Sequence, residues 1–165
     1  MTKHNLGSAL QEQGTRTDGP EAQRLFGQAV AAYREALLVW NRQQLPQQWA
    51  MAQNNLARAY FSLSQWNSAA ASYESVLEVH PDFRPAYERA RFLEHEVLFN
   101  YERAFRLNES WVKRNPNDLA ALAAFAETYF TTGNFDECAR RIPAVLSDQR
   151  SDAQITIPLR ALEIG

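Results

Sequence analysis

An internal repeat is the feature that most constrains how this chain folds. Leu56 is followed by a small residue and, four positions on, by Tyr60. The same pattern returns at Phe125 and Tyr129, so that Leu56 and Phe125 lie 69 residues apart. This separation is about two periods of 34 residues plus one further residue. Units of this size bury their apolar faces by stacking on one another, which predicts an elongated array of repeated units.

Helical spacing of apolar residues runs along most of the chain. Apolar side chains recur at steps of three and four, as one face of an α-helix requires. An alternating strand-like pattern is confined to residues 155–157. The sequence therefore predicts an all-α fold. Proline, glycine and polar residues interrupt the helical pattern at residues 14–20, 45–46, 64–66, 80–81, 115–116, 133–134 and 147–151.

Individual residues at these interruptions predict where helices begin and end. Asp118 can cap a helix that starts at Leu119, because its carboxylate accepts hydrogen bonds from unpaired backbone N–H groups. Pro116 disfavours the α conformation of Asn115 and so ends the preceding helix. Gly133 suits a tight turn that requires a positive φ.

The repeated pattern resembles the tetratricopeptide repeat (TPR), in which each unit is an antiparallel pair of helices. Small residues at fixed positions allow the two helices to approach, and aromatic residues fill the space beside them. Segment 50–83 matches with Leu56, Ala57, Tyr60, Ala69, Tyr73 and Pro81, and segment 119–147 matches with Leu122, Phe125, Ala126, Tyr129 and Cys138.

The resemblance implies a right-handed α-α superhelix of about four helix pairs plus a C-terminal helix, forming a single array over residues 1–165. Residues 33–57 are similar to the longer TPR variety of kinesin light chains and many bacterial proteins. Residues 5–10 resemble a first helix, and Ala29, Tyr33 and Ala36 resemble a second, so an insertion is expected between them at residues 14–23. The expected repeats are 4–45, 50–83, 84–118 and 119–150, and residues 152–165 are expected to form a capping or truncated helix.

The third expected repeat departs from the pattern. Its first helix is one residue too long, has Glu94 where an aromatic residue is expected, and lacks a glycine at its turn. These departures predict a distorted helix.

A groove lined by the first helices is where TPR arrays bind their partners, and the resemblance implies the same here. Asparagine amides can both donate to and accept from an extended backbone, and an arginine can bind a carboxylate through two hydrogen bonds. The corresponding strip at residues 120–131 is small and nearly uncharged, unlike the basic clamps of chaperone-binding TPRs. The predicted partner-binding groove consists of Met51, Asn54, Asn55, Arg58, Phe61, Phe92, Glu127 and Phe130.

The composition and the scattered positions of the ionisable residues and the cysteine argue against several other functions. The formal net charge of −2 gives no basic footprint for nucleic acid, and no apolar run is long enough for a membrane span. Neighbouring helix residues such as Glu94 and His95 point in different directions and cannot chelate one ion together. With no signal peptide and one cysteine, Cys138, a cytoplasmic location is expected.

These observations predict a binding scaffold and not an enzyme, with no catalytic residues, cofactor or metal. The expected partner is a protein or peptide, not nucleic acid, and membrane insertion is not expected. Two alternatives stay open. The chain is a self-assembling structural module that forms homo-oligomers, or it is a regulatory fragment of a larger protein.

Overall fold

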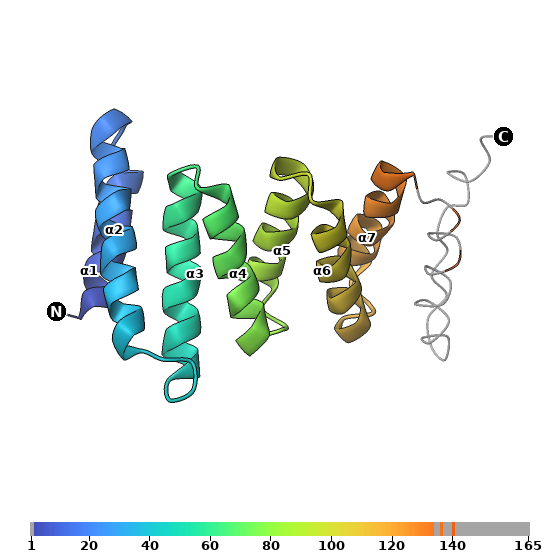
Figure 1. The fold of residues 1–165 in the computed structure, drawn as a ribbon, viewed down its shortest axis with the longest axis horizontal. Coiled ribbons are helices and arrows are strands. Elements are labelled where there is room, and N and C mark those ends of the chain that lie inside the picture. Colours follow the sequence, from blue (N-terminus) through green and yellow to red (C-terminus); the bar gives the residue numbers. More distant parts are fainter. Residues whose placement is uncertain (1, 134–135, 137–139, 141–165) are drawn as a thin grey trace.

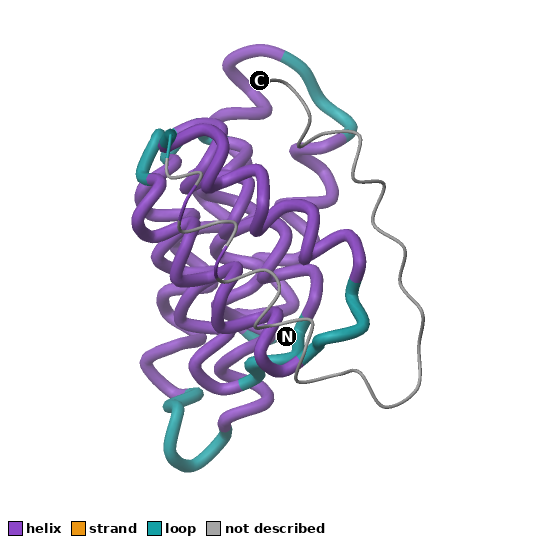
Figure 2. The backbone as a smooth tube through the Cα atoms, turned by 90° about the vertical axis from the view of Figure 1, so that its right-hand side faces the viewer, coloured by secondary structure: helices purple, strands orange, loops and turns teal. Residues whose placement is uncertain are grey.

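The computed structural model, which describes residues 2–133, 136 and 140, is a row of antiparallel helices (Figure 1). The described residues contain no strand, so the all-α prediction is confirmed. Each helix packs against the next one along the chain, and the turns lie at the helix ends (Figure 2). The helices are α1 (Lys3–Thr15), α2 (Gly19–Val39), α3 (Pro46–Ser62), α4 (Trp66–Val79), α5 (Arg84–Phe92), the π-helical turn η1 (Leu93–Val97), α6 (Tyr101–Arg114) and α7 (Leu119–Thr132).

Local signals explain several of these boundaries. The Asp118 carboxylate accepts a hydrogen bond from the Ala121 N–H at 3.2 Å and caps α7, as predicted. The last residue of α6 is followed by Asn115, which precedes Pro116. Proline occupies the first turn of α2, α3 and α5, where its missing N–H would have no helical partner in any case.

Small and aromatic residues build the contact between α3 and α4. Ala57 and Ala69 are completely buried, so the two helices approach closely. Tyr60 and Tyr73 are buried beside them in the same apolar cluster. A second cluster, around Trp111 and Phe125, joins α5, α6 and α7. Leu77 and Leu107 pack against both clusters, so apolar contacts continue from one cluster to the next, as a stack of helix pairs requires.

The expected insertion at residues 14–23 was wrong. Helix α1 continues to Thr15 and α2 begins at Gly19, so only Arg16, Thr17 and Asp18 connect them. Gly14 lies inside α1, and a Cβ atom there would be 3.0 Å from the ring of Phe26. This glycine allows helices α1 and α2 to approach each other and does not mark a turn.

The distortion predicted for the third repeat is present. The backbone N–H of Leu98 donates to the carbonyl of Leu93 at 2.8 Å, which is the wider spacing of a π-helix. Such a turn accommodates one additional residue, and this accounts for the extra position between Leu56 and Phe125. The repeat boundaries themselves remain predictions. Cys138 and the expected helix at 152–165 lie outside the described residues.

A residue with a positive φ lies where α1 joins α2, where α3 joins α4 and where η1 joins α6, and another directly follows α7. These residues are Gly19 (64°), Ser64 (57°), Phe99 (53°) and Gly133 (71°). Glycine adopts this conformation without steric strain, whereas a residue with a Cβ does so at a cost. Gly133 was predicted at such a turn, but Phe99 was not.

Replacing Phe99 with glycine is expected to stabilise the folded chain by about 1 kcal/mol, because relief of the left-handed strain exceeds the added entropy of the unfolded chain. Phe99 is 65% exposed, so little burial is lost. Urea unfolding would measure the change. The control is Ala71→Gly at an exposed position in α4, which is expected to destabilise the chain by about 1 kcal/mol. A loss of stability in Phe99→Gly would contradict the strain argument.

Candidate functional site

The eight predicted groove residues lie on three first helices, α3, α5 and α7. None of them is buried. Met51 is 46% exposed, Phe92 38% and Phe130 46%. Arg58 and Glu127 are also exposed, and Asn54, Asn55 and Phe61 are half-buried. Their accessibility is compatible with partner binding, and their role stays a prediction.

On α3 these residues form one stripe. Met51, Asn54, Arg58 and Phe61 follow one another at steps of three and four, so they share one face of the helix. The opposite face carries Leu56 and other buried residues, which pack into the core. We call this stripe the α3 face.

Neighbouring first helices contact each other on this side of the array. The guanidinium carbon of Arg89, on α5, lies 5.5 Å from the centre of the Phe61 ring, within the range of a cation–π contact. Further along, the Thr131 hydroxyl oxygen of α7 lies 3.3 Å from His95 Nε2 of η1. Through these contacts α3 meets α5, and η1 meets α7, on the side of the array that carries the α3 face.

Arg58 and Arg89 lack an acidic partner among the described residues. Helix α3 contains no acidic residue at all. Both arginines act on Tyr73, since burial raises the pKa of the Tyr73 hydroxyl and the positive charges of Arg89 and Arg58 partly offset that rise. Arg58, on the α3 face, and Arg89, beside Phe61, therefore place two cations without an acidic partner among the described residues on this side of the array. The cations that do form salt bridges with carboxylates of Asp or Glu are Lys3, Arg16, Arg24, Arg42, Arg84, Arg103, Arg106, Lys113 and Arg114.

A cavity of about 320 Å³ adjoins the α3 face. Met51 and Asn54 of the predicted groove line it together. The sequence did not identify His80 and Phe83, because they lie at and just after the interruption at residues 80–81, which signals only a helix end. The full lining is Gln47, Ala50, Met51, Asn54, Val76, His80 and Phe83.

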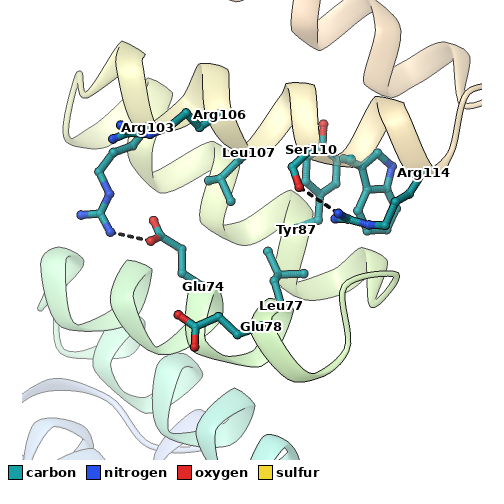
Figure 3. A pocket seen from close by; sticks show the side chains of 10 residues that line it. Glu74, Leu77, Glu78, Tyr87, Arg103, Arg106, Leu107, Ser110 and Arg114 are labelled. Carbon is teal, nitrogen blue, oxygen red and sulfur yellow. Dashed lines mark hydrogen bonds and ion pairs between the residues drawn. The ribbon is translucent and has the colours of Figure 1, made fainter.

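A larger cavity, of about 580 Å³, lies between the second helices α4 and α6 (Figure 3). Arg103 pairs with Glu74 across it, and Arg114 donates to the Ser110 hydroxyl at 2.8 Å. Arg106 is paired with Glu102. Arg114 Nε also lies 3.3 Å from Asp82 Oδ1. Each of the three cations lining this cavity is therefore paired with a carboxylate of the chain, in contrast to Arg58 and Arg89.

Glu94 lies next to the Arg103–Glu74 pair and is completely buried. Arg103 Nη1 is 3.5 Å from its Oε1, and within the described residues neither carboxyl oxygen has a hydrogen-bond partner. Burial raises the pKa of the Glu94 carboxyl, Arg103 lowers it in part, and the nearby Glu74 raises it further. Glu94, which departs from the repeat pattern, is therefore a buried acid of η1 that lies beside Glu74 of α4 and Arg103 of α6.

No three His, Cys, Asp or Glu side chains cluster in the described part of the chain in a way that could hold a metal ion. None of the described helices combines the length and apolar character that crossing a membrane demands.

Comparison with known proteins supports the repeat assignment. Residues 49–80 match a family model described as a tetratricopeptide repeat. The crystal structure of MamA is similar in fold, with a TM-score of 0.56 and 15% identity, over 87% of this chain and 78% of that chain. Another crystal structure of MamA covers 93% of this chain and 96% of that chain at 14% identity, with a TM-score of 0.49. Curated proteins give no significant match.

Proposed function

We propose that this chain, a tetratricopeptide repeat protein by its repeat at residues 49–80 and by its fold, binds an extended segment of a partner protein along its first helices. Such arrays act generally as protein–protein interaction modules. The observation that carries the finer proposal is the α3 face. Exposed apolar Met51, the Asn54 amide and the unpaired Arg58 lie there in one stripe, beside a cavity.

The α3 face combines the chemistry that a peptide backbone and its side chains need. An asparagine amide presents a donor and an acceptor to an extended chain. An arginine without an internal partner can bind a carboxylate without first breaking an existing salt bridge. We therefore assign binding to this face and propose Phe92, Glu127 and Phe130 as its continuation on α5 and α7.

Charge reversal at Arg58 is expected to weaken partner binding at least about tenfold, because a like-charge or unpaired contact replaces a favourable one. Affinity would be measured by fluorescence anisotropy with a peptide selected from an unbiased display library. The matched control is Arg106→Glu, on the exposed surface of α6. Circular dichroism would confirm that both variants fold. Equal binding by wild type and Arg58→Glu would contradict the assignment.

Self-association is a second candidate function, and one observation favours it. Leu38 and Val39, at the end of α2, are 85% and 70% exposed, and adjacent exposed apolar side chains can mark an interface. Light scattering over a range of concentrations would detect oligomers. Loss of association in Leu38→Asp, with peptide binding unchanged, would support it, whereas a mass independent of concentration would oppose it.

A further inference from the structure

The charge and the shape of the α3 face together indicate what kind of segment it binds, and this inference rests on the proposed function. Positive charge gathers at one end of the face. Arg58 and Arg89 have no salt bridge within the described residues, α3 contributes no carboxylate, and the only acidic residue of α5, Glu88, is paired with Arg84. An acidic side chain of a partner would be the first carboxylate that these arginines meet.

The other end of the face is apolar and recessed. The 320 Å³ cavity is lined mainly by apolar side chains, among them Met51, Val76 and Phe83. This volume is at the small end of ligand cavities and has room for one large apolar side chain. Methionine is flexible and can adapt its shape to such a group. The amides of Gln47 and Asn54 at the rim remain available for a peptide backbone.

The distance between the two ends sets the spacing in the partner. Met51 and Arg58 are seven residues apart on α3, which corresponds to about 10 Å along the helix axis. An extended chain advances about 3.3 Å per residue. A partner chain running along α3 therefore covers the distance from the cavity to Arg58 in about three residues.

We propose that the segment bound on the α3 face is an acidic, extended protein segment that carries a large apolar side chain about three residues from a carboxylate. The apolar side chain enters the cavity beside Met51 and Phe83, and the carboxylate pairs with Arg58 and Arg89. Basic segments are rejected, because they would place a third cation against these two arginines.

The test starts from a library of random dodecapeptides displayed on phage and selected on the full chain. The expected result is enrichment of acidic peptides in which Leu, Ile, Met or Phe stands about three positions from Asp or Glu. An enriched peptide is then synthesised together with its Asp→Asn and Leu→Ser variants. Each is titrated against wild type, Arg58→Gln/Arg89→Gln and Met51→Gln by fluorescence anisotropy.

The peptide Asp→Asn change is expected to weaken binding about tenfold with wild type and less than about twofold with the double arginine variant. The peptide Leu→Ser change should likewise matter less with Met51→Gln. Raising the salt concentration should weaken the wild-type complex. Arg106→Gln on α6 serves as the folded control.

Two failures are distinguishable. Enriched peptides that are neutral or basic, or an Asp→Asn effect of equal size in wild type and the double variant, would overturn the inference. The proposed function would survive that result if Arg58→Glu still abolished binding. If no enriched peptide loses affinity on Arg58→Glu, both the inference and the proposed function are wrong.

Discussion

Asn108→Leu is expected to destabilise the folded chain by about 3 kcal/mol, although leucine has the same branched shape and the same number of side-chain heavy atoms. Asn108 is completely buried in α6. Its Oδ1 accepts from the Tyr87 hydroxyl at 2.7 Å, and its Nδ2 donates to Thr128 Oγ1 at 2.9 Å and to the Ala124 carbonyl at 3.2 Å. One amide thus connects α5, α6 and α7.

Leucine would leave the Tyr87 hydroxyl buried without an acceptor and would break both bonds to α7. An unsatisfied buried group costs about 1–3 kcal/mol, in addition to the lost hydrogen bonds. Urea unfolding of Asn108→Leu would measure the loss. The double variant Tyr87→Phe/Asn108→Leu should recover part of it, because the orphaned hydroxyl is then absent.

The control for Asn108→Leu is Asn67→Leu, at an exposed position of α4, where a change within about 0.5 kcal/mol is expected. If Asn108→Leu proved as mild as this control, the buried amide would not connect α5, α6 and α7.

Arg103→Met is expected to destabilise the chain by about 2 kcal/mol at neutral pH. Among the described residues, the substitution leaves Glu94 buried with no cation and Glu74 with no ion-pair partner. Removing one partner of a fully buried pair costs about 3–5 kcal/mol. The Arg103 side chain is 40% exposed, so water screens part of its charge and the expected loss is smaller.

The effect of Arg103→Met should depend on pH in a definite direction. Burial raises the pKa of the Glu94 carboxyl, so the folded chain retains a proton that the unfolded chain releases. The stabilisation that comes from retaining this proton is fully present below the ordinary Glu pKa, and it is lost as pH rises through the raised pKa of the folded state. Losing Arg103 raises that pKa further, so the variant should fall behind wild type mainly at neutral and alkaline pH.

Urea unfolding at several pH values would follow the difference between wild type and Arg103→Met. Glu94→Gln serves as the companion variant, because its amide carries no charge and can donate to Glu74 Oε1, which has no hydrogen-bond partner among the described residues. Adding Glu94→Gln to Arg103→Met should restore stability at high pH. A loss of stability that is independent of pH would indicate that Arg103 acts through packing alone.

The sequence predicted features that depend on residues close together in the chain. Helical periodicity, the Asp118 cap and the turn at Gly133 are set by neighbours within a few positions, and the structure has all of them. The extra residue between Leu56 and Phe125 likewise predicted a distortion, although not that it would be a π-helical turn. For the groove, repeat position was sufficient to place Arg58 on an accessible surface.

Contacts between different helices decided the rest. Gly14 reads as a turn signal, but in the fold it accommodates the Phe26 ring. Asn108 reads as one polar residue of an amphipathic helix and is instead completely buried. The cavity beside Met51 also requires His80, which directly follows α4, and Phe83, which directly precedes α5.

The sequence alone therefore determined the helices, their pairing into repeats and the helix faces that remain accessible. Periodicity at three, four and 34 residues encodes these features, because side chains at such spacings share a face or a repeat position. Only the tertiary structure decided which charges are paired, which polar groups are buried and where cavities remain. Those properties depend on how closely neighbouring helices approach, and no local spacing in the chain specifies that distance.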